Sequence, residues 1–428
     1  MPTRITQYSI PRTTGEHDVA VVTAAAFVAA CAGYELASGN TYRALALCVL
    51  PFVAVLLAHP EAPLTLLGAS IPLLHSFALG GYLATVSDLL LVLVVAGILL
   101  QSLTTGSAMA ARALRPMAMP LLVYSAVLLA LLPVHYGVSE IAQTGQRFEL
   151  YLFPLLIGAF AALNNRHIPT LQAYAISTTV LAVAWPLGLV AGQKNPVGQL
   201  IGGAILLLVG VRSLRRLFPC LVVLVPGLLL TQSRGAIIAT VVGTIVILVM
   251  QGPNARMLMA RVVPLFLIAA VAFVLMPTAI QDRITTLSAA SSSPAAYAIE
   301  VRQQYAGDAW RIIHAHPWTG VGVGNYLAGS PNDLTQTNDP HHVLLLQAAE
   351  GGYVLAGGFL LLIFGSLVVL YRLRCVALVP AAAGILVATF AHGLVDVYWV
   401  RVTPVLSWLL VGMVCGLYAK GRDTLETA

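Results

Sequence analysis

Charged residues are scarce in this chain. Of its 428 residues, 59% are hydrophobic and only 9% are Asp, Glu, Lys or Arg, whereas soluble globular domains carry roughly 25% charged residues. This shortage excludes an ordinary soluble enzyme. The formal net charge is +6, but no basic patch interleaved with aromatic residues accompanies it, so nucleic acid is not an expected partner. Basic residues at membrane edges, where they meet the anionic headgroups of membrane lipids, account for the balance.

Patterns that would hold a metal or a cofactor are also missing. His314 and His316 stand two residues apart, which would place them on different faces of a helix. No Asp-x-Asp pair of the nucleotide-sugar type occurs, and no strand–helix unit surrounds the Gly-rich run 320–326. The cysteines lack Cys-x-x-Cys spacing and lie in or beside apolar runs, which predicts small core residues; they are Cys31, Cys48, Cys220, Cys375 and Cys415. The sequence therefore predicts neither a metal site nor a bound cofactor.

Long apolar runs, by contrast, recur along nearly the whole chain. A helix needs about 20 apolar residues to cross a bilayer. Runs of this kind predict spans at 18–36, 42–58, 64–84, 87–104, 117–135, 148–164, 169–190, 197–212, 216–232, 235–251, 259–277, 343–371, 376–398 and 402–419. The expected fold class is an all-α, polytopic transmembrane helical bundle of about 12–14 spans, because short runs such as 197–212 could be half-helices.

The distribution of basic residues predicts which turns face the cytoplasm. If the N-terminus is cytoplasmic, every second turn should be basic. The turns on that side carry Arg112, Arg115, Arg166, Arg212, Arg215, Arg216, Arg256, Arg261, Arg372, Arg374, Lys420 and Arg422. The opposite turns carry fewer and more isolated cations, which are Arg43, Arg147, Lys194, Arg234 and Arg401.

One hydrophilic stretch, residues 279–340, is long enough to be a functional loop, and the same topology places it outside the cytoplasm. The chain then divides into transmembrane helices over 1–278, a loop over 279–342 and three C-terminal spans over 343–428. Within the loop, the Ser/Ala/Pro patch Ser288–Ala296 suggests a mobile tip. The apolar spacing over 309–313 predicts that the second half is ordered and helical.

The few charges on the outer side are candidates for chemistry. They are Lys194, Arg234, Arg283, Arg302, Arg311, His341, His342, Asp396 and Arg401. Guanidinium groups beside a membrane suit a diphosphate, because arginine binds phosphate through two parallel hydrogen bonds. Each arginine could instead be an interfacial anchor that reaches lipid headgroups. That alternative is weaker for Arg234, which lies on the side where the positive-inside rule disfavours cations.

A histidine pair stands where a span begins. Pro340 is suited to a helix start and Asp339 to a cap, directly before His341 and His342. A neutral imidazole at a helix N-terminus could act as a general base, and the alternative is an interfacial pair without a catalytic role. About two turns deeper, Glu350 is a carboxylate within the membrane, which predicts a functional residue or a member of a buried polar network.

At these positions the sequence resembles the O-antigen ligase and O-antigen polymerase superfamily. Residues 341–352 are similar to its His-Asn-x-x-Leu-x-x-x-x-Glu-x-Gly signature, and 316–326 to its His-Pro-hydrophobic-x-Gly-x-Gly-x-Gly-Asn-Phe segment. Residues 231–235 resemble its Ser-Arg-Gly turn. Arg302 with Tyr305 resembles its Arg-x-x-x-Trp step, although the spacing and the aromatic residue both differ. The detailed likeness covers about 230–400.

The resemblance implies a GT-C-like membrane glycosyltransferase with one large periplasmic loop. Such an enzyme takes a glycan from undecaprenyl diphosphate and transfers it to an acceptor hydroxyl, with inversion and without a metal. The implied base is His341, and the implied diphosphate ligands are Arg234, Arg302 and Lys194. Supporting positions are His342, Glu350, Asp396 and Arg311. Two departures stand out, since the family usually has Asn at position 342 and its ligases often have Arg at position 194.

The resemblance leaves the acceptor open. Lipid A–core is preferred because the loop is single and compact and the chain is of modest length, which favours a ligase. A growing glycan (polymerase) or a protein hydroxyl (protein O-oligosaccharyltransferase) would use the same motifs. The implied location is the bacterial inner membrane, with the active site on the periplasmic side. A solute transporter of the bicarbonate type is a different possibility, but polar residues that gather on one side and in one loop favour an enzyme.

Overall fold

The structure is a computed structural model. It describes residues 53, 55–74, 76–79, 82–106, 108–135, 137–190, 192–251, 255–278, 281, 294–329, 340–396 and 402–426. The chain forms two compact units, Met1–His59 and Pro60–Ala428. The predicted span 18–36 and most of 42–58 lie outside the described residues.

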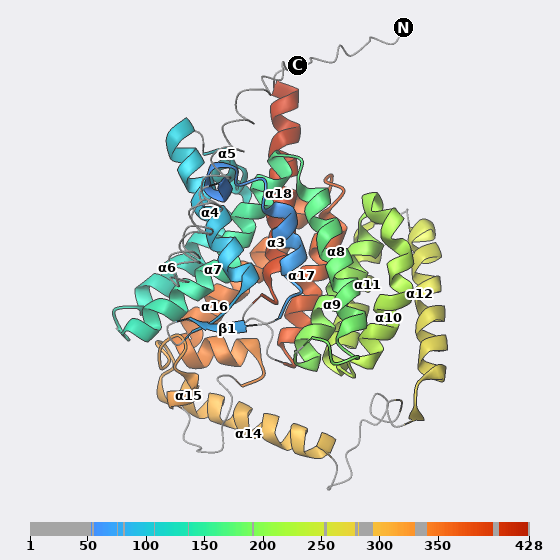
Figure 1. Ribbon diagram of the computed structural model, residues 1–428. Coiled ribbons are helices and arrows are strands. Elements are labelled where there is room, and N and C mark those ends of the chain that lie inside the picture. Colours follow the sequence, from blue (N-terminus) through green and yellow to red (C-terminus); the bar gives the residue numbers. More distant parts are fainter. Residues whose placement is uncertain are drawn as a thin grey trace, which may run out of the picture. The chain divides into compact units, whose positions relative to one another are not determined.

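The second unit is built almost entirely of apolar helices (Figure 1). Five helices among the described residues are long and apolar enough to cross a membrane: Val86–Thr105, Glu140–Leu163, Arg212–Leu230, Arg234–Gln251 and Val343–Arg372. Shorter apolar helices accompany them at Arg115–Leu131, Val262–Leu275, Val379–Gly393 and Val405–Gly421. These features confirm the prediction of a largely helical, multi-pass membrane protein, whereas the count of 12–14 spans stays a prediction.

The predicted span 64–84 is wrong. Its place is taken by a short helix, α3 (Leu64–Ser70), and an antiparallel hairpin of β1 (Ser76–Leu79) and β2 (Tyr82–Thr85). Pro72 lacks a backbone N–H, and the Gly80-Gly81 pair favours a tight turn. An apolar run that contains such residues can thus form a hairpin instead of a continuous helix.

The next helices form the first half of the unit. Thr85 caps α4 (Val86–Thr105) through a capping box with Asp88. The chain continues through α5 (Met109–Ala113), the 3-10 turn η1 (Arg115–Met117), α6 (Ala118–Leu131) and α7 (Val138–Leu163). The prediction placed this last span at 148–164 and Arg147 in the turn before it. Arg147 is instead buried within α7, because the amphipathic residues 138–147 continue the helix.

A second group of helices follows, and α12 closes it. These elements are α8 (His167–Ala184), α9 (Lys194–Gly210), the 3-10 segment η2 (Arg212–Cys220), α10 (Leu221–Leu230), α11 (Arg234–Gln251) and α12 (Ala255–Leu275). The predicted span 216–232 starts too late, since helical structure begins at the basic residues of η2. Among the described cysteines, Cys415 is buried as predicted and Cys220 is partly buried, but Cys375 is exposed in the turn before α17.

The hydrophilic segment contains α14 (Pro294–Ala315) and the short α15 (Tyr326–Gly329). Most of the Ser288–Ala296 patch lies outside the described residues. Ala309, Ile312 and Ile313 of α14 pack on the first turns of α16 (Val343–Arg372) around Tyr326. This packing confirms the prediction of a helical second half. The chain ends with α17 (Val379–Gly393) and α18 (Val405–Glu426).

The two ends of the unit differ in chemistry. At one end, Lys420 Nζ donates to Asn165 Oδ1 at 2.6 Å. Gly210, at the end of α9, lies against Ala381 in the first turn of α17, close in sequence to the basic turns at Arg212 and Arg372. The opposite end holds the starts of α7, α9, α11 and α16 and the end of α17. It is at this second end that the predicted site residues lie.

Candidate functional site

The turn at residues 231–235 is fixed by local hydrogen bonds. Gln232 adopts a positive φ of 54°, the Ser233 amide donates to Thr231 Oγ1 at 3.2 Å, and Ser233 Oγ accepts from the Ala236 amide at 3.4 Å. A β-carbon at Gly235 would lie 2.6 Å from the His392 ring. Glycine therefore lets α11 approach α17 closely, and Arg234 begins α11 beside the C-terminal end of α17.

The histidine pair begins α16 in a different way from the prediction. His342, and not Asp339, is the N-cap: its Nδ1 accepts from the Leu345 amide at 3.3 Å. The proposed Asp339 cap lies outside the described residues, and Pro340 precedes the helix instead of starting it. His341 adopts a positive φ of 53°. This conformation turns the His341 side chain out of the helical register, while burial lowers the pKa of His342.

His341 meets two other predicted residues from distant parts of the chain. Its Nδ1 lies 2.8 Å from Asp396 Oδ1, just after α17, and Arg302 of α14 donates from Nη2 to Asp396 Oδ2 at 2.8 Å. The Asp396 side chain is only 8% exposed, whereas 24% of His341 and 42% of Arg302 stay exposed. The carboxylate is thus the buried centre of a cluster whose two outer groups remain accessible.

The N-terminal turn of α9 adds a fourth group to this cluster. Asn195 Nδ2 also hydrogen-bonds Asp396 Oδ2, and Lys194 precedes it as the first residue of α9. Arg234 lies at the same end, because a β-carbon added to its neighbour Gly235 would lie 2.6 Å from His392 and 3.1 Å from Val395. The structure therefore brings Lys194, Arg234, Arg302, His341 and Asp396 to one end of the helices. We call these five residues and Asn195 the open cluster.

The hydrogen bonds of the open cluster fix the state of its imidazole. A carboxylate can only accept, so His341 Nδ1 carries the proton that is shared with Asp396, and the lone pair of a neutral ring then resides on Nε2. The ring of Tyr305 stacks on that of His341 with centroids 5.8 Å apart and an angle of 16° between the planes. Orientation and tautomer are both set, as general-base chemistry requires.

A second layer lies one turn deeper and was missed by sequence reasoning. Gln199, one turn after Asn195, contacts His392 Nδ1 through Oε1 at 2.6 Å and donates to Thr389 Oγ1 at 2.9 Å. The Asp396 amide in turn donates to the His392 carbonyl at 3.0 Å. These bonds tie α9 to α17 beneath the carboxylate. The sequence signal for this layer was His392, a histidine inside an apolar run. The signal for Asn195 was its position directly after Lys194.

Glu350 lies elsewhere, in a closed cluster. It is paired with Arg147 of α7 at 2.7 Å, and the two side chains are 2% and 7% exposed. The other carboxylate oxygen accepts from the Gly324 amide at 3.0 Å. The loop 316–326 also binds the backbone of α16, since the Val321 and Gly322 amides donate to the carbonyls of Ala349 and Glu350. Glu350 therefore joins α7, α16 and this loop.

A kink makes this docking possible. Helix α16 is interrupted at Gly351 and Gly352, and Gly352 has a φ of 67°. The Tyr353 amide donates to the Pro317 carbonyl at 2.7 Å, and a β-carbon at Gly352 would overlap the backbone of Trp318. The two glycine-containing motifs at 316–326 and 341–352 are thus the two sides of one backbone contact, which holds the start of α16 in place below His341.

The remaining predicted residues differ in position. Arg311 pairs with Asp308 within α14 and is largely exposed, so this ion pair is local to α14 and lies outside the open cluster. Arg283 and Arg401 lie outside the described residues. Within the part of the chain that the structure describes, no group of three or more His, Cys, Asp and Glu side chains is arranged to hold a metal ion.

Comparisons with known proteins agree with the motifs. Residues 219–363 match the sequence model of the family described as O-antigen ligase. This segment includes the turn at Arg234, Arg302, the loop 316–326 and His341 with the part of α16 that contains the kink at Gly351 and Gly352. A comparison with curated proteins finds no match. The matched segment, about a third of the chain, is similar to the O-antigen ligase family and supports the likeness to the O-antigen ligase and polymerase superfamily.

Proposed function

We propose that this protein is a membrane glycosyltransferase that moves a glycan from undecaprenyl diphosphate to an acceptor hydroxyl at the open cluster. The contact of His341, Asp396 and Arg302 carries the proposal, because it joins three segments distant in sequence around one carboxylate. A scaffold protein has no need of such a cluster. An accessible imidazole beside accessible cations is suited to removing a proton and holding a diphosphate.

The cations hold the leaving group in this proposal. Arg302 uses one nitrogen on Asp396, and a guanidinium has further N–H donors for a phosphate. Arg234 and Lys194 begin α11 and α9, so both stand at helix N-termini, which favour anions. Lys194 can bind phosphate as a point charge where related ligases have Arg. The family match to an O-antigen ligase supports a lipid-linked glycan as the donor.

His341 acts as the base. The acceptor O–H gives its proton to Nε2, and the acceptor oxygen attacks the anomeric carbon from the side opposite the diphosphate. The bond between that carbon and the diphosphate oxygen breaks, and its electron pair leaves with the diphosphate, against the cations. The attack inverts the anomeric centre. Asp396 positions His341 and stabilises the imidazolium that forms, without contact to the substrate.

Lipid A–core is the proposed acceptor, with a growing glycan or a protein hydroxyl as the second candidates. The proposed location is the bacterial inner membrane. The basic turns around Arg166, Arg212, Arg372 and Lys420 then face the cytoplasm, in line with the positive-inside rule, and the open cluster faces the periplasm. Purified acceptors distinguish these candidates, because a ligase glycosylates lipid A–core and a polymerase extends the lipid-linked glycan itself.

The test is glycan transfer by the purified protein from a lipid-linked donor. His341→Ala should lower the turnover number by roughly 10²–10⁴-fold, the usual contribution of a general base, with an unchanged unfolding temperature. His314→Ala is the matched control, because His314 is an exposed histidine on α14 outside the open cluster. A metal chelator should leave the rate unchanged. Full transfer by His341→Ala would refute the role of His341, and solute uptake into vesicles without any transfer would favour a transporter.

A further inference from the structure

Helix α16 is longer than the hydrocarbon core of a bilayer is thick. It contains 30 residues, which at about 1.5 Å per residue amount to about 45 Å, whereas the core measures about 30 Å. Tilt alone would have to exceed about 40°, the upper end of the usual range, to bury this length. The kink at Gly351 and Gly352 divides the helix into a first segment, residues 343–350, and a second segment, residues 353–372. The second segment, at about 30 Å, is by itself long enough for one crossing.

The two segments of α16 differ in what surrounds them. Residues 343–352 are all buried or partly buried, because α14 packs on the first segment and the Val321 and Gly322 amides donate to its last two carbonyls. The second segment carries exposed apolar side chains on one face of the helix, namely Val354, Leu361, Phe364 and Val368. Protein thus covers the first segment, whereas this face of the second segment is open to the surrounding lipid.

An aromatic pair lies where the exposed apolar face begins. Trp318 is 67% exposed and Tyr353 is 45% exposed, and their rings meet edge to face with centroids 6.3 Å apart. The Tyr353 amide donates to the Pro317 carbonyl at 2.7 Å, so the backbone of the loop 316–326 holds the pair on the helix. Tryptophan and tyrosine are enriched where hydrocarbon meets headgroups, because each ring is apolar and carries one polar group.

A second aromatic residue stands at the other end of the same face. Tyr371 is 58% exposed, and the Arg374 guanidinium lies over its ring, 4.9 Å from the centroid. Along the helix axis, Tyr353 and Tyr371 are about 27 Å apart, which is close to the thickness of the hydrocarbon core, about 30 Å. The apolar face of α16 is therefore bracketed by two aromatic residues at the spacing of the two membrane surfaces.

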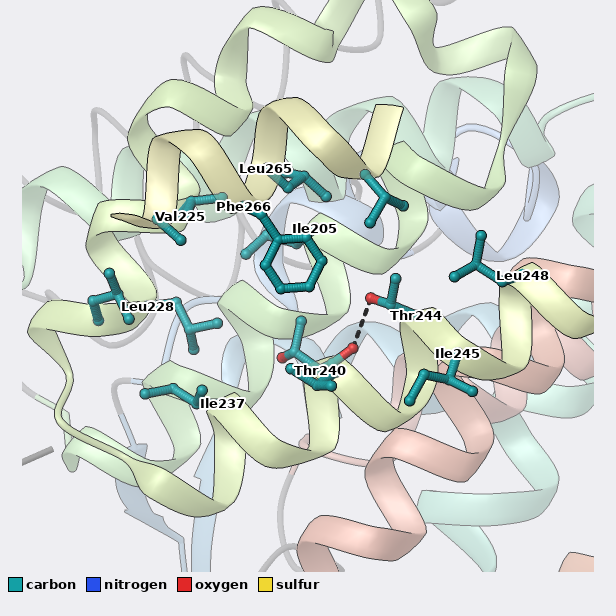
Figure 2. A pocket seen from close by; sticks show the side chains of 14 residues that line it. Ile205, Val225, Leu228, Ile237, Thr240, Thr244, Ile245, Leu248, Leu265 and Phe266 are labelled. Carbon is teal, nitrogen blue, oxygen red and sulfur yellow. Dashed lines mark hydrogen bonds between the residues drawn. The ribbon is translucent and has the colours of Figure 1, made fainter. Parts of the chain in front are cut away.

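Helix α11 has its apolar exposure at a matching position. Its exposed apolar side chains begin at Ile238, one turn after Arg234, and continue through Val241, Ile245 and Val249. Val241 and Ile245 also line the apolar groove that Figure 2 shows beside α12. At the end that holds the starts of α11 and α16, both helices thus carry polar groups first and lipid-facing side chains below them.

We propose that Trp318 and Tyr353 form an interfacial anchor that binds the lipid headgroup layer and sets the membrane surface at the kink of α16. The inference goes beyond the proposed function and does not depend on glycan transfer. The hydrocarbon begins below Tyr353, so the first segment of α16 and His341 lie at or above the headgroups. The pair of Arg147 and Glu350 lies at headgroup level too, and it is enclosed by protein and not by lipid, unlike the carboxylate within the membrane that the sequence predicted.

Fluorescence quenching in lipid nanodiscs tests the anchor. The chain has five tryptophans, so the contribution of Trp318 is the difference in intensity between the protein and Trp318→Phe. Phosphatidylcholine with bromines near the headgroup end of its acyl chains should quench this contribution more strongly than phosphatidylcholine with bromines near the methyl end. Quenching by aqueous acrylamide alone would overturn the anchor, and stronger quenching by the deep bromines would place Trp318 inside the hydrocarbon and overturn the boundary.

Trp310→Phe is the matched control. Trp310 is 48% exposed on α14, next to Ala309, which packs on the first segment of α16. Because that segment lies above the hydrocarbon in this proposal, the contribution of Trp310 should be quenched by acrylamide and by neither brominated lipid.

A series of tryptophans along α16 tests the boundary without relying on Trp318. Tyr353→Trp, Phe364→Trp and Tyr371→Trp replace exposed side chains, so the fold should tolerate them, and each is compared with Trp318→Phe as the parent. The shallow bromines should quench most strongly at Tyr353→Trp and Tyr371→Trp, and the deep bromines at Phe364→Trp. Strongest quenching of Tyr353→Trp by the deep bromines would show that the membrane surface lies above the kink, and the proposal would be wrong.

Discussion

Two arginine–carboxylate pairs lie near the same end of the helices, and they differ in what surrounds them. Arg147 and Glu350 are 7% and 2% exposed, and a backbone amide of the loop 316–326 binds the second oxygen of Glu350. Arg302 is 42% exposed above an Asp396 that is 8% exposed. One pair is closed to ligands from every side that the structure describes, and the other presents a cation and an imidazole at the surface.

The difference separates a residue that holds the fold from residues that can bind a substrate. Taking two charges out of water is costly, and a buried pair is retained only where further hydrogen bonds satisfy it. Glu350 meets this condition, because Arg147 of α7 and the Gly324 amide of the loop 316–326 both bind its carboxylate. Asp396 is equally well bonded, but its partners stay accessible. Charge within an apolar chain is thus informative about function only when the accessibility of its partner is known.

Breaking the closed pair should have the largest effect on stability. Arg147→Ala leaves Glu350 buried without its partner, which costs about 3–5 kcal/mol. A fall in the unfolding temperature of the purified protein in detergent measures this cost. The double variant Arg147→Met with Glu350→Leu should recover most of the loss, because apolar side chains fill the space without charge. An unchanged unfolding temperature for Arg147→Ala would show that the ion pair does not contribute to the stability of the protein.

Breaking the open pair should spare stability and impair transfer. Asp396→Asn keeps the size of the side chain but offers an N–H group to His341 Nδ1, which favours the tautomer with its proton on Nε2. The turnover number should fall by roughly 10²-fold, near the lower bound for loss of a general base. A purely structural role for Asp396 would instead predict a lower unfolding temperature and an unchanged turnover number for the protein that remains folded.

The sequence predicted what depends on composition and on local pattern. Scarce charge and repeated apolar runs predicted the helical membrane fold, and the spacing over 309–313 predicted a helix in the hydrophilic segment. The span at 64–84 failed because hydropathy does not distinguish a continuous helix from a short helix followed by a hairpin. The prediction that Arg147 lies in a turn was wrong for a related reason. A long helix can carry a buried arginine when its partner, here Glu350, is supplied by a segment 203 residues away in the sequence.

The site was predictable in part. Motif order and the alternation of basic turns placed His341, Arg302, Arg234 and Lys194 on one side of the membrane. The contacts of Asp396 with His341, Arg302 and Asn195 join segments distant in sequence, which no local pattern encodes. The expectation that Glu350 supports the reaction stays untested, although its position gives it a structural link to the start of α16.

The smallest expected effect concerns His342, where related proteins usually have Asn. Its Nδ1 must carry a lone pair to accept from the Leu345 amide, and burial lowers the pKa of His342 below its ordinary value of 6.5. Because the folded pKa lies below the unfolded one, the unfolded chain binds the proton more tightly. The cap is therefore intact above pH 6.5, and its contribution is lost as the pH falls through the lowered folded pKa.

His342→Asn should retain the cap, since Asn is a good N-cap residue, and remove its titration. At pH 7.5 the variant and the wild type should differ by only a few tenths of a kcal/mol, and at pH 5 the variant should be more stable by about 0.5–1 kcal/mol. Unfolding temperatures at the two pH values measure the difference. His314→Asn, on the exposed face of α14, should follow the wild type at both, and equal pH dependence of His342→Asn and wild type would show that the cap does not titrate.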